Sequence, residues 1–253
     1  MSRHLRAEWT KATTLRGTGW MLLGIVALAV LVSAAATATV TCDAVRCGQD
    51  TTKLALMGIQ AGQVVVAVLA VLSIGDEYGT GMIHTTLLAL PRRTGMLAAK
   101  AAVLSALVLG AAIPAALASW LLGRLILPAR GFPPLPPLTD PTTLRAVAGS
   151  VLYLVLVALL SLGLATIVRD PAAGVGTVLG VLFLLPILGA MIPDPDWQRW
   201  VWKISPMNAG LAIQSTRYLA ELPLTPWAGL GVAAAWAAAS LATATRLLHT
   251  RDA

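Results

Sequence analysis

Residues 146–168 read AVAGSVLYLVLVALLSLGLATIV, an apolar run of 23 residues without one Asp, Glu, Lys, Arg or His. A helix needs about 20 such residues, at 1.5 Å each, to cross a hydrocarbon core of roughly 30 Å. Only Arg169 and Asp170 separate this run from a second one, residues 171–193. Two spanning helices joined by two residues must form a tight antiparallel hairpin. This stretch therefore predicts a bundle of transmembrane helices.

Four more charge-free runs of spanning length lie on either side of the hairpin. Apolar residues make up 57% of the chain and charged residues 11%, against roughly 45–50% and about 25% in soluble domains. No remaining segment is long enough for an independent soluble domain. We therefore predict one all-α, polytopic membrane domain over residues 1–253, with spanning helices at residues 17–40, 54–74, 101–123, 146–168, 171–193 and 226–245.

Three of these helices have a clear start signal. Asp140-Pro141, Asp170-Pro171 and Thr225-Pro226 each place a capping side chain directly before a proline. This order is typical of the first turn of a helix.

The net charge of +7 is spread over the segments that flank the spans. The basic residues form no continuous stripe, so we do not expect a nucleic-acid partner. We expect them to contact membrane lipids instead. Ten of the 18 basic residues, four of them before the first span, lie in segments that share one side with the termini. We therefore expect both termini in the cytoplasm, and the excess of 14 Arg over 4 Lys favours a bacterial plasma membrane.

The N-terminal segment, residues 1–16, carries Leu5, Trp9 and Ala12 at helical spacing among several charges. One interpretation is a helix at the membrane interface, with its cations facing anionic lipid. The other is a basic tail that only fixes the topology.

The segment 194–225 is expected to hold re-entrant or interfacial helices on the outer side. Trp197, Trp200 and Trp202 suit the boundary between headgroups and hydrocarbon, either in a loop that dips back to the surface or in an ordinary aromatic belt. We expect a helix to start at Ser205-Pro206 and to run to about Glu221.

Three groups of residues inside or between the spans have two readings each. Cys42 and Cys47, in the first outer loop, can form a disulfide or remain free. Gln60 and Gln63 share a face of the second span and can line a substrate path or serve helix packing. The small residues of the sixth span, Gly231, Ala235 and Ala239, are expected to seat it against a neighbouring helix.

Motifs for catalysis are missing from the sequence. There is no phosphate loop, dinucleotide turn, zinc-protease helix or nucleophile elbow, and the three His and two Cys are too few and too scattered for a metal site. We therefore expect neither enzymatic activity nor a cofactor. The predicted spans also lack ionisable groups of the kind that ion-driven carriers use, so the energy for any transport must come from a partner.

The richest polar stretch is the cytoplasmic segment 75–97. Acidic residues and two glycines precede a short helix expected from about Thr80 to Leu90, which Pro91 ends. A rod with flexible ends is suited to being pushed by a partner. Its candidate functional residues are Asp76, Glu77, Tyr78, Gly79, Thr80, Gly81, Met82, Ile83, His84, Leu87, Arg92 and Arg93.

At this segment the sequence resembles the ABC-2 type permease family, in which a glutamate-tyrosine and a glycine-threonine turn precede the helix that docks on an ATPase. The residues that match are Glu77, Tyr78, Gly79, Thr80 and Gly81, and a basic N-terminal helix containing Glu8-Trp9-Thr10-Lys11 adds to the likeness. The resemblance covers nearly the whole chain, which departs from the family's larger members in having no large extracytoplasmic domain.

The resemblance implies a permease subunit of an exporter for lipid-like, peptide or antibiotic-like substrates. Two permeases, identical or paralogous, would work with two cytoplasmic ATPases, and these would bind the ATP and Mg. Glu77 and the Arg92-Arg93 pair would anchor the coupling rod through ion pairs or headgroups, although the arginines also suit a purely topological role. Met82, Ile83 and Leu87 would fill the ATPase groove. The alternative is a membrane scaffold or immunity protein that moves nothing.

Overall fold

The structure, a computed structural model, describes residues 3–42, 47–79 and 93–250. In these residues it contains helices and loops but no strands. Six of the helical segments are long and apolar enough to cross a membrane, as predicted. They are α2 (Arg16–Thr39), α4 (Gly58–Gly79), α6 (Arg93–Ile126), α7 (Pro141–Val168), the segment Pro171–Met191 that begins with α8, and α12 (Pro226–Thr250).

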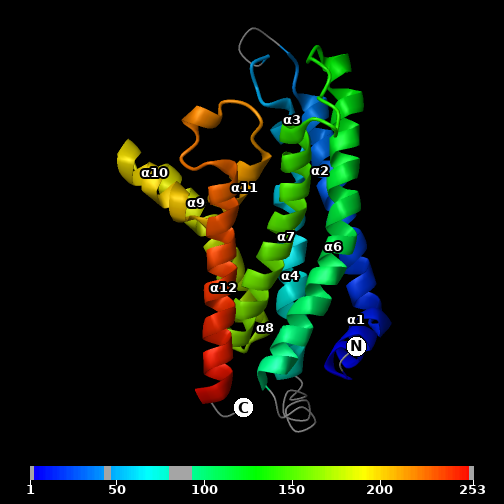
Figure 1. The fold of residues 1–253 in the computed structure, drawn as a ribbon, viewed down its shortest axis with the longest axis vertical. Coiled ribbons are helices and arrows are strands. Elements are labelled where there is room, and N and C mark those ends of the chain that lie inside the picture. The colour runs from blue at the N-terminus through cyan, green and yellow to red at the C-terminus, as the bar shows by residue number, and fades with distance from the viewer. Residues whose placement is uncertain (1–2, 43–46, 80–92, 251–253) are drawn as a thin grey trace.

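Helix α7 forms the centre of the bundle. It packs against α4, α6, α8 and α12, while α2 covers α4 and α6 from the outside (Figure 1). Its side chains are buried on several faces, from Thr143 near its start to Thr166 near its end. Helix α1 (Arg3–Thr14) and the end of α12 lie at the same end of the bundle, which we call the terminal end.

Two spanning helices extend further toward the terminal end than the apolar runs predict. Helix α4 continues to Gly79, beyond the expected end at residue 74, and α6 begins at Arg93, before the expected start at residue 101. A helix does not stop where the hydropathy falls, because neighbouring helices can cover its polar continuation. Glu77 and Lys100 are therefore helical residues of the bundle.

At the end of the bundle opposite the termini, the second span starts differently from the prediction. A short helix, α3 (Thr51–Ala55), is capped by Asp50, whose side chain accepts a hydrogen bond from the Lys53 amide. The chain then turns before α4 starts at Gly58, so the second span starts four residues later than predicted. A 3₁₀ turn, η1 (Pro128–Arg130), follows α6.

The aspartate-proline signals mark helix starts, as predicted. The Asp140 carboxylate accepts hydrogen bonds from the side chain of Thr142 and the amides of Thr142 and Thr143, and these bonds lower the pKa of Asp140. Asp170 caps α8 (Pro171–Leu179) through the Ala173 amide. Between α7 and α8, Arg169 adopts a left-handed conformation with φ of 63°, which closes the tight hairpin.

The fifth span bends away from the bundle. After α8 comes a π-helical segment, η2 (Gly180–Leu184), and then α9 (Leu185–Met191) with Pro186 in its first turn. A widened turn and a proline are the usual causes of a kink. Helix α9 and the following α10 (Pro195–Ile204) project sideways from the other helices (Figure 1). Met191, Trp197 and Trp200 are exposed there.

The predicted helix from Ser205 to Glu221 is wrong in its length. Helix α11 (Pro206–Leu211) is followed only by two 3₁₀ turns, η3 (Ala212–Gln214) and η4 (Leu219–Glu221). The cause is a tertiary contact, because the Asp50 carboxylate accepts hydrogen bonds from the amides of Thr216 and Arg217. These amides face another part of the chain and cannot continue the helix.

Within this bundle, α12 packs through a different set of small residues from the one that the sequence predicts. Gly231, Ala235 and Ala239 are exposed in the described structure. The buried face instead carries Gly229, Ala233, Ala237, Ser240 and Ala244. Both series have small residues at similar spacing, so spacing alone does not tell them apart.

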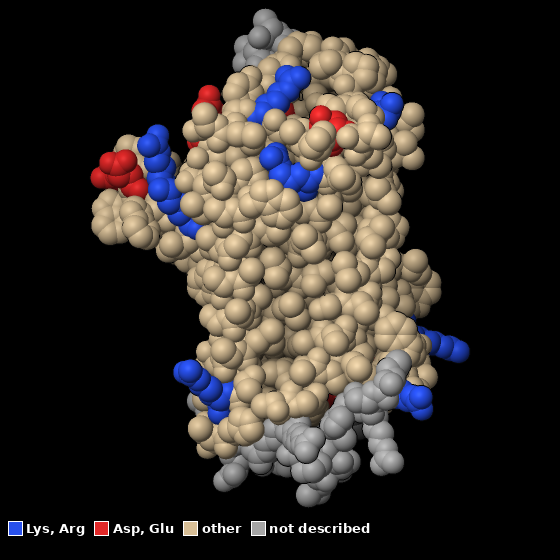
Figure 2. Space-filling model, viewed as in Figure 1, with Lys and Arg blue, Asp and Glu red and all other residues tan. Residues whose placement is uncertain are grey.

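Charged side chains lie toward the two ends of the molecule on the face drawn in Figure 2. The band between them is free of Lys, Arg, Asp and Glu on this face. Such a band is what contact with hydrocarbon requires.

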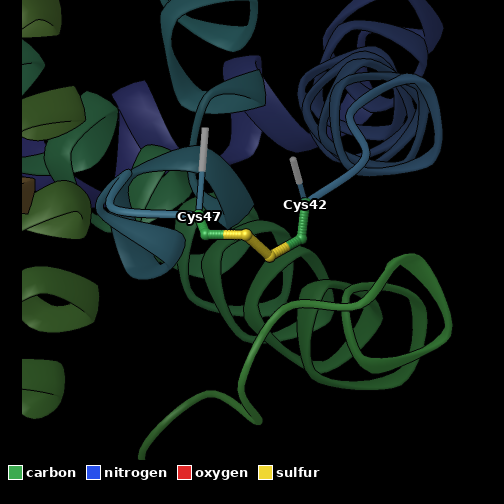
Figure 3. The surroundings of a disulfide bond; sticks show 2 residues. All are labelled: Cys42 and Cys47. Carbon is green, nitrogen blue, oxygen red and sulfur yellow. A yellow bond between two sulfur atoms is a disulfide. The ribbon is translucent and has the colours of Figure 1, made fainter. Parts of the chain in front are cut away.

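The two cysteines form a disulfide (Figure 3). Cys42 follows α2, Cys47 precedes α3, and their Cα atoms lie 4.7 Å apart. Of the two readings of this pair, the structure contains the bridged one.

Candidate functional site

Helix α1 brings a carboxylate and an ammonium group to the terminal end of the bundle. It lies along α6, and its charged residue Glu8 is only 7% exposed, whereas its neighbour Trp9 is 43% exposed. Consecutive residues of a helix point in different directions, so one face of α1 meets the bundle and another faces outward.

Lys100 of α6 lies at the centre of this site and is 4% exposed. Its Nζ donates hydrogen bonds to Glu8 Oε2 at 2.9 Å, to Glu77 Oε1 at 2.8 Å and to the backbone oxygen of Ser73 at 2.9 Å. An ammonium group has three hydrogens. All three are used, so one buried cation joins α1, α4 and α6.

Glu77 of α4 receives a second cation, because Lys11 also donates to its Oε1. Glu8, Lys11, Glu77 and Lys100 thus form two carboxylates and two ammonium groups, which we call the charge cluster. Buried ions lose hydration that costs several kcal/mol each, and only close opposite charges and hydrogen bonds offset this loss. The cluster is stable because its charges balance and meet at hydrogen-bond distance.

The charge cluster changes two conclusions from the sequence. One of the two interpretations of the N-terminal segment places its cations toward anionic lipid, but Lys11 binds Glu77, since burying that carboxylate requires cations nearby. The spans were expected to lack ionisable groups, but Glu77 and Lys100 belong to the ends of spanning helices and are buried. The argument against ion-driven transport therefore holds for the middle of the bundle and not for its terminal end.

Tyr78, next to Glu77, connects α4 to the hairpin between α7 and α8. The guanidinium carbon of Arg169 lies 5.7 Å from the centre of the Tyr78 ring, within the range of a cation–π contact. The last turn of α4 is therefore attached on one side to α1 and α6 and on the other to the hairpin.

The rest of the predicted coupling segment falls largely outside the described residues. Gly79 ends α4 and Arg93 begins α6. Asp76 lies on the same last turn of α4 as Glu77 and takes part in an interaction of its own. The residues outside the described structure are Thr80, Gly81, Met82, Ile83, His84, Leu87 and Arg92.

A pocket of about 520 Å³ opens beside the charge cluster, between α1, α2, α4 and α6. Its polar end is formed by the four residues of the cluster with Ser73 and Asp76. The rest of its wall is apolar and includes Met21, Leu69, Leu72, Leu104 and Leu107. This volume lies within the range of small-molecule sites, roughly 300–1,000 Å³.

The two glutamines of the second span have different surroundings. Gln63 is fully buried, accepts a hydrogen bond from the hydroxyl of Tyr153, and donates one to Met207 Sδ at 3.1 Å. These contacts join α4, α7 and α11, as expected of a packing residue. Gln60 is partly exposed and lines a second pocket of about 310 Å³ between α10, α11 and the loop before α12.

Sequence reasoning missed the ion pairs that join Lys100 to Glu8 and that join Lys11 and Lys100 to Glu77. The charges of Lys11 and Lys100 look like topology signals, because Lys and Arg near the ends of spans usually have that role. One signal was present: a glutamate on the basic N-terminal helix does not help a positive-inside topology. The presence of Glu8 therefore indicates a cationic partner inside the protein.

The sequence matches no model of a known protein family, and no curated protein matches it.

Proposed function

We propose that the chain is the membrane-spanning permease subunit of an ABC-2 type exporter. It moves an amphipathic substrate, of lipid-like, peptide or antibiotic-like chemistry, outward across a bacterial plasma membrane. ATP hydrolysis in two separate ATPase subunits drives the movement, and a second permease, identical or paralogous, completes the transporter. Both termini face the cytoplasm.

The observation that carries this proposal is the attachment of Glu77. It lies on the last turn of α4, directly before the segment that would meet the ATPase, and it is 1% exposed between cations from α1 and α6. A force applied just beyond Gly79 would therefore act on three helices at once. Tyr78 and Arg169 would pass the same force to the hairpin between α7 and α8.

Helix α1 suits the same mechanism. It would lie at the cytoplasmic interface with Trp9 at headgroup depth, while Glu8 ties it to Lys100. An interfacial helix held by a buried ion pair would follow the motion of α6. The coupling segment and α1 would then respond to the ATPase together.

The first test is purification of the tagged full chain from its native membrane, with mass spectrometry of what accompanies it. We expect an ATPase that contains a phosphate loop, in a ratio near one to one. Proteoliposomes holding both proteins should move a fluorescent amphiphile only when ATP and Mg are supplied. Uphill transport by the chain alone on an ion gradient would contradict the proposal, and so would the absence of any ATPase.

The second test separates coupling from folding. The double variant Glu77→Gln with Ile83→Ala should retain ATPase activity and lose most of the transport, because the force would no longer reach the bundle. Met57→Ala, an exposed position in the turn that precedes α4, is the control and should transport normally. Normal transport in the double variant would remove the coupling role from these residues.

A further inference from the structure

The pocket beside the charge cluster has a polar end and an apolar end along the same two helices. On α6, Lys100 is followed by Val103, Leu104 and Leu107, and the spacing of these residues places them on one face. On α4, Leu69, Leu72, Ser73 and Asp76 form the equivalent face in the opposite direction. Seven residues of helix extend about 10 Å. The pocket therefore changes from charged to apolar over roughly that length.

The polar end contains an acceptor that the described part of the chain leaves unused. Oε2 of Glu77 is buried and has no hydrogen-bond partner among the described residues. Lys100 cannot serve it, because its three hydrogens already bind Glu8, Ser73 and Glu77 Oε1. Leaving a buried carboxylate oxygen without a donor is unfavourable, so the site favours a ligand that brings one.

We propose that this pocket binds an amphiphile with an ammonium head, which donates to Glu77 at the polar end while its apolar chain lies along Leu69, Leu72, Leu104 and Leu107. A charged donor forms a stronger hydrogen bond with a carboxylate than a hydroxyl does. The Asp76 side chain also lines the pocket. The ammonium can come from the headgroup of a phospholipid or from a free cationic amphiphile.

This site is independent of the exporter proposal, because binding requires neither an ATPase nor transport. It lies within one chain and is lined by residues of α1, α2, α4 and α6. An occupant would contact the charge cluster directly.

The test uses the full chain in phosphatidylcholine nanodiscs, whose quaternary headgroups carry no hydrogen-bond donor, titrated with decylammonium by calorimetry against empty nanodiscs. We expect saturable binding at one site. Decyl sulfate, which has the same tail and the opposite charge, should bind at least about tenfold more weakly, and so should decanol. Equal affinity for decyl sulfate would overturn the proposal.

Two glycines at the start of α2 provide a matched pair of variants. A Cβ at Gly17 or at Gly19 would have no atom within 4 Å, so both positions accept a larger side chain. Only Gly17 lines the pocket. Gly17→Leu should weaken decylammonium binding about tenfold or more, and Gly19→Leu should leave it unchanged. Unchanged binding in Gly17→Leu would exclude this pocket as the site.

Glu77→Gln tests the head of the ligand, because it keeps the shape of the side chain and removes its charge. We expect a loss of affinity of about tenfold or more, and retained affinity would overturn the role of Glu77. If this variant does not fold, the glycine pair still decides the question.

A final experiment identifies whether the ammonium group that occupies the site comes from a lipid headgroup or from a free amphiphile. Adding phosphatidylethanolamine to the nanodiscs should lower the apparent affinity for decylammonium if a lipid headgroup occupies the site. No change would assign the site to a free cationic amphiphile. Both results keep the proposed chemistry, whereas no saturable binding in either membrane would reject it.

Discussion

At the residue scale, Lys100 contributes most to the terminal end of the bundle. One ammonium group donates hydrogen bonds to carboxylates from two helices and to a backbone oxygen, and without it Glu77 would keep only Lys11 from the charge cluster while Glu8 would lose its partner there. Sequence position alone makes Lys100 look like an ordinary flanking cation. Its contacts show that it joins α1, α4 and α6.

We predict that Lys100→Met destabilises the protein by about 3–5 kcal/mol, because Glu8 and Glu77 are left as buried carboxylates near each other. Unfolding in a denaturing detergent, followed by circular dichroism, measures the loss. The triple variant that adds Glu8→Gln and Glu77→Gln should recover most of the stability, since no carboxylate is then buried without its cation and the remaining Lys11 side chain is partly exposed to water. A single variant as stable as the natural protein would contradict this account.

At the element scale, small residues decide how closely the helices approach. A Cβ at Gly58, at the start of α4, would lie 1.8 Å from the backbone oxygen of Ala29 and 2.6 Å from Ser33 Oγ on α2. The Ser33 hydroxyl also accepts a hydrogen bond from the Gly58 amide at 3.0 Å. A backbone atom cannot move away as a flexible side chain can, so this glycine sets the contact between the two helices.

We predict that Gly58→Ala separates α2 from α4 and costs about 1–3 kcal/mol in the free energy of unfolding. Gly110→Ala is the matched control, because a Cβ there meets no atom within 4 Å. In a helix interior that change should stabilise the protein by about 0.5–1 kcal/mol. Thermal unfolding of both variants in the same detergent compares them, and equal effects of the two would argue against close packing at Gly58.

Asp50 joins two outer elements that are far apart in the sequence. Its carboxylate caps α3 and also accepts hydrogen bonds from the backbone of Thr216 and Arg217 and from the Thr216 hydroxyl. This contact ends the helical course that the sequence predicts for residues 205–221. It also fixes the loop before α12 to the start of α3.

We predict that Asp50→Ala speeds hydrogen exchange at the Thr216 and Arg217 amides about tenfold or more, because hydrogen bonds to a charged group are lost. Exchange followed by mass spectrometry on peptides covering 212–221 gives the rate. Asp194→Ala removes a comparable cap, that of α10, and should leave these peptides unchanged. Unaltered exchange after Asp50→Ala would mean that the contact does not hold this loop.

At the scale of the whole molecule, α3, which follows the disulfide in the chain, and the termini lie at opposite ends of the bundle (Figure 1). The band that is free of charges on one face lies between these ends (Figure 2). The proposed orientation places the disulfide outside the cell, where oxidising conditions keep such a bond formed. The charge cluster is then on the cytoplasmic side.

We predict that a maleimide that cannot cross membranes labels Cys42 and Cys47 on intact cells only after treatment with a reductant. In a chain where both are replaced by serine, Thr250→Cys should be labelled only after the membrane is opened, because the proposed orientation places the end of α12 in the cytoplasm. Labelling of Thr250→Cys on intact cells would reverse the proposed orientation.

The sequence by itself determined the six spanning helices and where several of them start, because hydropathy and aspartate-proline caps are local properties of the chain. It did not determine where α4 and α6 end toward the terminal side, which small residues of α12 face the bundle, or the course of residues 205–221. It also did not identify the partners of Glu77. Glu8 and Lys100 are separated by 92 positions, and Lys11 and Glu77 by 66. Only tertiary packing brings such residues together, since the cost of burying a charge depends on what the other helices place beside it.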